Sequence, residues 1–397
     1  MKKYKILHLS NNLVSGGAGK AARTINKALQ EAGMQSKMLD LPLTSQWDKF
    51  KNTFRAYFDK VPLQFYQRVS KTAFSTANIG IGLSQFDCVK ESDIIHLHWV
   101  QQGYMGFKDL RYLASAGKKV FINMHDSWWL SGGCHVTHGC NHWEANCGFC
   151  PQLNSRRAND LSRRIFIKKR AILSSINPTI ICASHWMHER ACSSPMFNGF
   201  KIVRIPYCID LEKYRPVNQR FAREKLNLPI EKKLILFGSV DLDDPNKGFH
   251  YFRDAVNAIP GNEVEVILFG NLKEGNLFLN KKSNNMGHVS DEEMLVLIYS
   301  AADVFVAPSL EDNFPNTVLE SISCGTPVVA FDIGGMPDMI VHSKNGFLAQ
   351  KGNVSELSQG MIECLNDEVG MKTFARNKAL ESFSYSTLVN LFTQIYQ

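Results

Sequence analysis

The 397-residue sequence lacks features that mark several special classes of protein. It has no run of about 20 apolar residues, the length that a membrane-spanning helix needs. It shows no internal repeat and no low-complexity segment. Its basic start, Lys2-Lys3, is followed neither by a long apolar stretch nor by a small-residue cleavage site, so we expect a cytoplasmic rather than a secreted protein.

The composition itself is that of an ordinary globular protein. Hydrophobic residues make up 44% of the chain and charged residues 21%, which excludes a largely disordered protein. At about 100–200 residues per domain, the length predicts two domains, with three as the alternative.

The net charge of +8 is unevenly distributed along the chain. Residues 1–205 hold 28 Lys and Arg against 12 Asp and Glu, whereas the remainder holds 17 against 25. The basic half indicates an anionic partner, which could be a membrane surface, a nucleic acid or a phosphorylated substrate.

Short apolar segments alternate with helical patterns twice along the chain, which predicts two parallel sheets. We expect two doubly wound α/β domains joined near 206–230, with a ligand site in the cleft between them. The predicted strands are Lys5–Leu9, Ile94–His98, Lys119–Asn123, Thr179–Ala183 and Lys201–Ile205, then Lys233–Phe237, Glu265–Phe269, Val304–Ala307 and Pro327–Ala330.

A glycine-rich loop, Ser15-Gly16-Gly17-Ala18-Gly19, lies between the first strand and a predicted helix, Lys20–Ala32. Glycines let the backbone approach a ligand, and the helix start behind them favours an anion. Neither the P-loop nor the dinucleotide fingerprint is complete, because Ala21 and Ala22 replace required residues. An ordinary tight turn is the alternative.

The strongest local signal is the segment from Pro308 to Glu320, which follows a predicted strand and runs into an apolar helix. A helix start near Asn316 or Thr317 would offer free backbone amides to a pyrophosphate. Glu320, about one turn further on, could accept hydrogen bonds from a ribose, and Asp312 could face a sugar. A surface carboxylate pair around an ordinary turn is the alternative.

Asp312 and Glu320 have the spacing of the paired-acid motif of the retaining GT-B glycosyltransferases of family four, which the sequence resembles. The family's first acid is usually Glu rather than Asp. The resemblance runs along nearly the whole chain. The other segments that resemble the family are Ser15-Gly16-Gly17, Asp93 to His98, His125-Asp126, Ile205 to Asp210, Lys247-Gly248 and Phe331 to Asp338.

This resemblance implies a GT-B fold, with two Rossmann-like domains facing across a cleft. Residues 1–205 would form the acceptor domain, with a Cys-rich insert at about 126–152 like that of a bacterial polysaccharide-assembly branch. A linker at 206–230 would lead to the donor domain at 231–380. Residues 381–397 would form a helix that packs back toward the first domain.

The resemblance also implies roles for single residues. Asp312, Glu320, His125 and Lys247 would be catalytic, and Lys247 would neutralise the departing diphosphate. The mechanism implied is front-face attack with retention and without a catalytic metal. The family's second phosphate-binding cation, an Arg, is replaced by Ser239. Donor-binding residues would be Gly16, Gly17, Ser239, Lys247, Asn313, Phe314, Asn316, Thr317, Val318 and Glu320.

Two of these residues have alternative interpretations. His125 could border the donor sugar, could ligate a metal together with the cysteines that follow, or could be a strand-end histidine bonded to the backbone. Lys247 could be a solvated loop lysine.

Four of the ten cysteines lie close together in the sequence, at Cys134, Cys140, Cys147 and Cys150. A Cys-x2-Cys pair plus two more thiols can close a tetrahedral zinc site. A structural zinc, free thiols and disulfides are all compatible with this spacing, and a reducing compartment disfavours disulfides.

Two segments of the basic half, Lys49–Lys71 and Arg156–Arg170, concentrate its charge, and aromatic residues are interleaved with the first. Such a pattern suits an anionic membrane surface, and a solvated helix face over core aromatics is the alternative. Common RNA-binding motifs are absent and the second half is acidic, so we expect no nucleic acid partner.

We therefore expect an enzyme that moves a sugar from a UDP- or GDP-sugar to a saccharide acceptor or a lipid-diphosphate-linked saccharide. Its product would belong to a cell-surface polysaccharide, such as O-antigen, capsule or exopolysaccharide. It would act in the cytoplasm, peripherally on the inner membrane face. The alternatives are a catalytically impaired relative that binds nucleotide-sugar, and a nucleic-acid-binding protein that uses the basic half.

Overall fold

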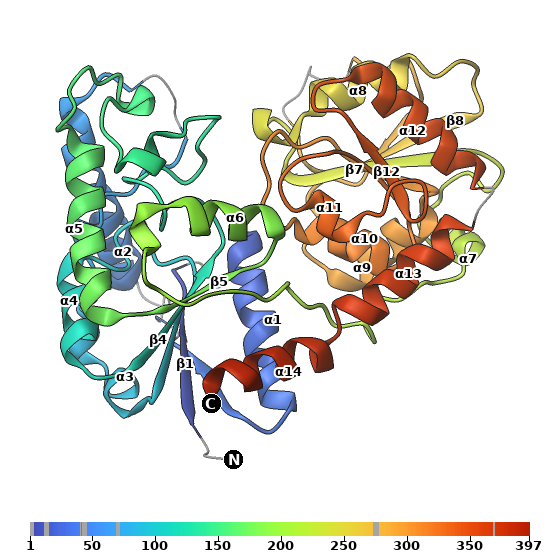
Figure 1. Ribbon diagram of the computed structural model, residues 1–397. Helices are drawn as coiled ribbons and strands as arrows, with labels where there is room; N and C mark the ends of the chain where they lie inside the picture. The colour runs from blue at the N-terminus through green and yellow to red at the C-terminus, as the bar shows by residue number, and fades with distance from the viewer. Residues whose placement is uncertain are drawn as a thin grey trace. The chain divides into compact units, whose positions relative to one another are not determined.

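The computed structural model describes residues 4–11, 16–39, 41, 46–68, 72–272, 278–367 and 370–397 (Figure 1). The chain forms two compact units. Unit 1 contains residues 1–205 together with 391–397, and unit 2 contains residues 206–390. Ser15 and Lys71, which the sequence patterns above include, lie outside the described residues.

Unit 1 is built on a six-stranded parallel sheet with the strand order β2-β1-β3-β4-β5-β6. The chain runs outward from β1 to β2 and then continues on the other side of β1 with β3. The order therefore reverses between β1 and β3, where doubly wound sheets bind ligands at the carboxyl ends of the strands. The strands are β1 Lys5–Leu9, β2 Gln35–Met38, β3 Ile94–Leu97, β4 Lys119–Met124, β5 Thr179–Cys182 and β6 Ile202–Arg204.

Unit 2 repeats this plan with the order β12-β11-β10-β7-β8-β9, also parallel throughout. Its strand order reverses between β7 and β10. The strands are β7 Lys233–Asp241, β8 Val264–Asn271, β9 Ser283–Asn285, β10 Val304–Ala307, β11 Val328–Phe331 and β12 Gly346–Ala349.

Helices connect the strands in both units (Figure 1). In unit 1 they are α1 Gly17–Glu31, α2 Gln46–Lys60, α3 Asp87–Glu91, α4 Phe107–Ser115, α5 Leu161–Ile176 and α6 His185–Ser193. The later helices are α7 Gln219–Lys225, α8 Phe249–Asn257, α9 Glu292–Ala301, α10 Asn316–Ser323, α11 Met336–Met339, α12 Val354–Asn366, α13 Met371–Ser382 and α14 Tyr385–Tyr396. Among the described residues, no helix combines the length and apolarity needed to cross a membrane.

The central strands are buried on both faces, which is why they appear in the sequence as continuous apolar runs. All four residues of β3, β10 and β11 are buried. The predicted doubly wound α/β fold is confirmed. Three strands were not predicted, β2, β9 and β12, and all three lie at an edge of their sheet.

The segment 206–230, predicted as a linker, is part of unit 2 and contains α7. Arg223 of this helix is buried and forms an ion pair with Asp303 at 2.8 Å. The Asp303 carboxylate also accepts a hydrogen bond from the Leu234 amide of β7. These contacts bind the segment to the sheet of unit 2.

The chain returns to unit 1 at the end of α14. The Tyr396 hydroxyl lies 2.8 Å from His96 Nε2 in the core of that unit, and Lys119 Nζ donates to the Tyr396 carbonyl at 3.0 Å. Burial raises the pKa of Tyr396 well above its ordinary value, so this hydroxyl keeps its proton.

Candidate functional site

In unit 2 the loops that follow β7 and β10 lie where the strand order reverses, and hydrogen bonds tie them together. The Asn246 side chain donates to the Glu311 carbonyl at 2.8 Å and accepts from the Glu311 amide at 3.1 Å. Gly248, at the start of α8, has a positive φ of 71°, and a Cβ there would lie 2.1 Å from the Pro308 carbonyl oxygen. Only glycine allows the two loops to approach this closely.

Lys247 and Asp312, 65 residues apart in the sequence, form an ion pair in this loop cluster. Lys247 Nζ lies 2.8 Å from Asp312 Oδ2, and a third of the lysine side chain is exposed. The Asp312 charge raises the pKa of Lys247 despite opposing desolvation, so the ammonium stays charged at neutral pH. Two predicted catalytic residues therefore lie in direct contact.

A third loop, after β11, supports Asp312 from its backbone side. Gly334 has φ 55°, and a Cβ at this position would lie 1.8 Å from the Asp312 carbonyl oxygen. The Gly335 amide donates to that same carbonyl at 3.1 Å. The position of Asp312 thus depends on a glycine pair more than 20 residues further along the chain.

Helix α10 begins at Asn316, four residues after Asp312, with Pro315 as its N-cap and no side-chain capping bond. Asn316 and Thr317 are half-buried and Val318 is buried. The first amides of a helix have no partner within the helix and carry its positive dipole end, so this start suits an anion.

Two predicted donor-binding residues precede this helix start and are buried, Asn313 and Phe314. The Phe314 ring packs edge-on against Tyr207 and Phe383, with ring centroids 5.4 and 5.6 Å apart. Phe314 therefore anchors the loop in the interior of unit 2.

Glu320, one turn into α10, is buried and accepts a hydrogen bond from the Tyr299 hydroxyl at 3.0 Å. Burial and the Glu320 charge raise the pKa of Tyr299 well above its ordinary value, so the phenol stays protonated and donates. The sequence patterns did not single out Tyr299, because a tyrosine within an apolar helix looks like a core residue.

Ser239 occupies the position at which the resemblance predicts an arginine. It closes a turn at the end of β7. Its hydroxyl donates to the Asp241 carbonyl at 2.7 Å. The residue is buried, so its side chain serves the loop structure.

In unit 1 the described glycines of the loop lie at the start of α1, and the predicted His125 lies at the carboxyl end of β4. Gly16 is the N-cap of α1 with φ 88°, and Gly17 is the first helical residue. His125 directly follows β4, and its Nε2 lies 2.9 Å from Nδ1 of His98, which follows β3.

His125 is the last member of a chain of hydrogen bonds, in part fully buried, that the sequence patterns did not reveal. His98 Nε2 lies 2.9 Å from His8 Nδ1, and His8 Nε2 lies 3.0 Å from the Ser36 hydroxyl. That hydroxyl donates to Asn26 Oδ1 at 2.8 Å. We call His125, His98, His8, Ser36 and Asn26 the histidine relay.

The hydrogen bonds of the relay all run in one direction, because the Ser36 hydroxyl donates its single hydrogen to Asn26. His8 must therefore donate from Nε2 and accept at Nδ1, so His98 donates from Nε2 and His125 donates from Nε2 in turn. Burial lowers the pKa of His8 to about 3 and that of His125 to about 4, and it lowers the pKa of His98 well below its ordinary value. All three rings are thus neutral near pH 7, with the His125 hydrogen assigned to Nε2.

Asp126, next to His125, organises the start of the Cys-rich insert. It lies 2.7 Å from His135 Nδ1 and accepts hydrogen bonds from Trp99 Nε1 and the Trp128 amide, both at 2.9 Å. Burial alone would raise the pKa of Asp126, but His135 and these donors lower it, so the carboxylate is charged.

The four clustered cysteines, Cys134, Cys140, Cys147 and Cys150, line one small cavity of about 20 Å³ together with His142. All four thiols are free, which argues against the disulfide interpretation. The cavity has room for a single ion, and its donor set suits zinc. The sulfurs do not form a group with all ligand atoms within 4.8 Å in the described part of the chain, so they would have to draw closer around a metal.

The described residues contain one group with that spacing, His8, His96 and His98. His8 Nδ1 and His98 Nε2 lie 2.9 Å apart and form a hydrogen bond. These two nitrogens therefore belong to the histidine relay and are not available to a metal.

Lys169 corrects one part of the sequence interpretation. It falls within the basic segment Arg156–Arg170, yet it is fully buried, with its ammonium 3.8 Å from the Trp128 ring centroid. It donates to the Trp128 carbonyl and, at 3.0 Å, to the Ser131 carbonyl. Burial lowers the pKa of Lys169 to about 7, so this residue adds nothing to a basic surface.

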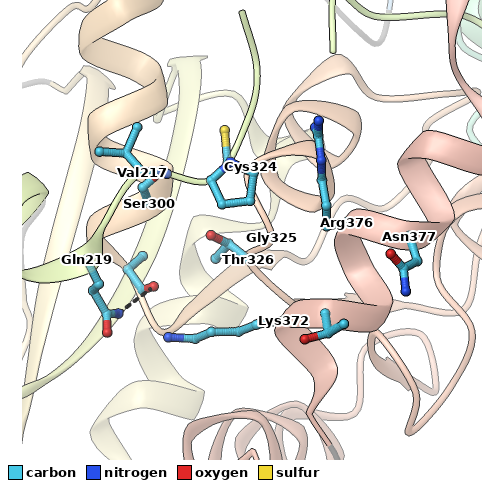
Figure 2. Close-up of a pocket in the computed structure, with 12 residues that line it drawn as sticks. Val217, Gln219, Ser300, Cys324, Gly325, Thr326, Lys372, Arg376 and Asn377 are labelled. Carbon is cyan, nitrogen blue, oxygen red and sulfur yellow. Dashed lines mark hydrogen bonds between the residues drawn. The ribbon is translucent and has the colours of Figure 1, made fainter. Parts of the chain in front are cut away.

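A larger cavity of unit 2, about 300 Å³, lies at the C-terminal end of α10, and Figure 2 shows the residues that line it. Cys324, Gly325 and Thr326 line it from that helix end, and Lys372 and Arg376 line it from α13. None of the predicted site residues lines this cavity.

Comparisons with known proteins show a likeness to one family over part of the chain. Residues 231–367 match the family model described as "Glycosyl transferases group 1". A UDP-Gal:alpha-D-GlcNAc-diphosphoundecaprenol alpha-1,3-galactosyltransferase of Escherichia coli is 26% identical over 230 residues, which are 55% of this chain and 59% of that protein. A D-inositol 3-phosphate glycosyltransferase of Mycolicibacterium smegmatis is 27% identical over 201 residues, 47% of this chain and 45% of that protein. The chain thus aligns with about half the length of these curated relatives.

The fold is shared over a greater length. The crystal structure of Anabaena HepE in complex with UDP matches with a TM-score of 0.64 and 17% identity, covering 99% of both chains. At this identity the likeness concerns the fold.

Proposed function

We propose that the chain, which has the GT-B fold, is a group 1 glycosyltransferase that transfers a sugar, with retention, from a nucleotide-sugar to a saccharide acceptor. The observation that carries the proposal is the ion pair of Lys247 and Asp312 beside the start of α10. A charged lysine and the first amides of a helix, where the positive end of the helix dipole lies, together suit a nucleoside diphosphate.

The proposed step moves charge toward these groups. The bond between the anomeric carbon and the diphosphate oxygen breaks, and the acceptor oxygen bonds to the same face of that carbon. The acceptor's proton passes to the leaving phosphate. Lys247 and the first amides of α10 stabilise the negative charge that develops on the leaving group. Asp312, held by Gly335, would contact the sugar, and Glu320, oriented by Tyr299, would contact the ribose.

In unit 1 we propose that His125 contacts the donor sugar. The histidine relay supports this role, because it fixes which nitrogen of His125 carries the hydrogen. Such a fixed tautomer is what a residue needs when it forms one directed hydrogen bond to a substrate.

We propose an acceptor saccharide carried on a lipid diphosphate, in the synthesis of a cell-surface polysaccharide. The name of the Escherichia coli relative supports this class of acceptor, and the strongly basic composition of residues 1–205 agrees with a doubly charged diphosphate. The donor would be a UDP- or GDP-sugar, and the UDP complex of the structural relative supports the nucleotide class.

We also propose a structural zinc ion for the four clustered cysteines, which would stabilise the insert without taking part in the reaction. Their common cavity and free thiols support this assignment.

A second function has one observation in its favour. The family's second phosphate-binding cation is absent, since Ser239 occupies its place and closes a turn. The chain could therefore bind nucleotide-sugar without turnover. A Glu320→Ala variant with lower turnover than an active wild-type protein would exclude this alternative.

The primary test is a thermal-shift panel of UDP- and GDP-sugars, followed by a transfer assay with the stabilising donor. We expect one nucleotide class to raise the melting temperature, and Lys247→Met to abolish that rise. If no nucleotide-sugar stabilises the protein, the proposed donor site is wrong. Salt-dependent oligonucleotide binding without any nucleotide-sugar effect would favour the nucleic-acid alternative instead.

A further inference from the structure

Helix α2 of unit 1 exposes an unusual set of aromatic side chains. Most rings of this size are buried in a folded protein or scattered singly over its surface. Here five consecutive aromatic positions of one helix are exposed, and the turn after it adds a sixth. Their exposed fractions are Trp47 71%, Phe50 59%, Phe54 44%, Tyr57 56%, Phe58 38% and Phe65 85%.

The rings form one continuous stripe. At 3.6 residues per turn, positions 47, 50, 54, 57 and 58 fall within an arc of about 100°. Neighbouring rings touch along it, with centroid distances of 5.9 Å for Trp47–Phe50, 6.1 Å for Phe50–Phe54 and 4.2 Å for Phe54–Phe58. We call these five residues the aromatic stripe.

The helix docks onto unit 1 through its opposite, polar face. Asp59 is its single buried residue, and it accepts hydrogen bonds from the Thr76 and Asn78 amides at 3.2 and 3.0 Å. A Cβ on Gly103 would lie 2.5 Å from the Arg55 backbone, so the chain packs closely against that same face. An amphipathic surface helix normally buries its apolar face, and α2 does the reverse.

Two anchors hold this arrangement in place. Leu63, in the turn after α2, is buried in the core of unit 1. Desolvation of Asp59 raises its pKa, but the donors from Thr76 and Asn78 oppose that shift. The aromatic stripe therefore cannot turn inward without losing these contacts.

Basic residues border the stripe. Lys49, Lys51 and Lys60 are exposed on the same helix, and no exposed acidic residue lies on it, since Asp48 is half-buried and Asp59 is buried. The unit as a whole has an excess of positive charge. Aromatic rings enter the headgroup region of a bilayer, and lysines beside them attract anionic lipids.

We infer that the aromatic stripe of α2 inserts into the surface of an anionic lipid bilayer and holds unit 1 at the membrane. This inference rests on the surface of α2 alone and goes beyond the proposed reaction. It would place a lipid-linked acceptor within reach of unit 1 without a membrane-spanning segment in the described residues.

The test is co-sedimentation of the full chain with phosphatidylcholine vesicles that either contain or lack phosphatidylglycerol. We expect binding to the vesicles that contain phosphatidylglycerol, with weaker binding at high salt. The double variant Phe50→Ser/Phe54→Ser should weaken the partition coefficient about tenfold per ring. Lys49→Gln/Lys51→Gln should weaken it about fivefold per charge, on the anionic vesicles only.

The matched control is Phe221→Ser/Phe374→Ser, which removes two comparably exposed rings from unit 2 and should leave vesicle binding unchanged. Circular dichroism would verify that each variant folds. Because binding is measured without donor or acceptor, its outcome is separate from that of the sugar-transfer assay.

The insertion itself can be observed through Trp47. Its fluorescence should shift to shorter wavelength on anionic vesicles and be quenched by brominated lipids, and Trp47→Phe should remove both signals. No vesicle binding, or equal binding by the Phe50→Ser/Phe54→Ser variant, would overturn the inference. Concentration-dependent dimerisation that this variant abolishes, in the absence of vesicle binding, would assign the stripe to a second copy of the chain and would overturn it as well.

Discussion

At the scale of single residues, Lys247 has a counter-charge already in place. Its ammonium lies against Asp312, and only a third of the side chain is exposed. A diphosphate would compete with Asp312 for the same cation. The two members of the pair should therefore respond to substitution in opposite directions.

We predict that Lys247→Met weakens nucleoside diphosphate binding by tenfold or more, because a hydrogen bond to a charged group is worth about 1.5–3 kcal/mol. Asp312→Asn should leave that binding unchanged or tighten it, while it lowers turnover. Isothermal titration and a transfer assay would measure the two effects. Lys232→Met is the control, because it removes a similarly exposed lysine that pairs with Glu263. Parallel losses of binding in both site variants would contradict the pairing argument.

The histidine relay makes a second prediction for single atoms. We expect ¹⁵N spectra of the labelled protein at neutral pH to show His125 with its hydrogen on Nε2. Ser36→Ala removes the acceptor for His8 Nε2 and should shift the nitrogen resonances of His8, His98 and His125 together. Ser174→Ala, a surface change on α5, should shift none of them. A hydrogen on Nδ1 of His125 in the wild-type protein would refute the assigned direction.

Short loops rather than helices or strands determine the geometry of the unit 2 site. Gly248 and Gly334 allow these loops to approach one another closely. Gly334 combines a positive φ with backbone contact to Asp312. Gly261 has a similar φ of 76° but open space around it. An alanine at Gly261 would therefore introduce backbone strain alone, whereas an alanine at Gly334 would also displace neighbouring atoms.

We predict that Gly334→Ala destabilises unit 2 and weakens nucleotide-sugar binding, because the new methyl group must displace Asp312. Gly261→Ala should cost only the left-handed backbone strain, about 1 kcal/mol, and should leave binding unchanged. Chemical denaturation and titration with the nucleotide-sugar would measure both. Equal effects of the two changes would mean that Asp312 does not depend on this loop.

A further prediction concerns zinc binding by the Cys-rich insert. Burial raises the pKa of Cys134 to about 12, and it raises the pKa values of Cys147 and Cys150 as well. Metal binding must therefore release protons, and its affinity should fall as the pH falls. We expect about one zinc per chain by elemental analysis, and a chelator should lower the melting temperature.

Cys147→Ser should remove the zinc, whereas Cys192→Ser, an exposed cysteine outside the cluster, should retain it. Metal-free protein with an unchanged melting temperature would favour the free-thiol interpretation.

Elements could be predicted from the sequence where burial makes them apolar. Strands β1 and β10 have the predicted ends, and the other central strands differ by a few residues. The edge strands β2 and β9 are polar and short, since one side of each has no partner strand, and they left no apolar run to detect. The histidine relay did leave a signal, because His8 and His98 interrupt otherwise apolar segments. Their contacts depend on the strand order, which a single sequence does not supply.

The histidines of the relay also affect the stability of the whole molecule. The folded-state pKa values of His8 and His125, about 3 and 4, lie below the ordinary value of 6.5. The unfolded chain therefore takes up protons first as the pH falls, and stability is lost between about pH 6.5 and 4. Each such histidine contributes up to about 1.4 kcal/mol per pH unit.

We predict that the unfolding free energy of the protein decreases over this range, and that His8→Gln reduces the slope. Urea unfolding at several pH values would measure it, and His288→Gln, at an exposed position, should leave the slope unchanged. The slope is independent of any overall loss of stability in the variant. A pH-independent free energy between 4 and 6.5 would contradict the buried, neutral state of these rings.

Tyr396 also affects the order in which the chain can fold during synthesis. The ribosome completes residues 206–390 before it makes the segment that places Tyr396 against His96. Unit 1 therefore emerges first but lacks part of its core until unit 2 has been synthesised. In the interval, His96 lacks its contact with the Tyr396 hydroxyl, and the nascent unit is exposed to chaperones and proteases. Of the two units, the one that is synthesised first is therefore completed last.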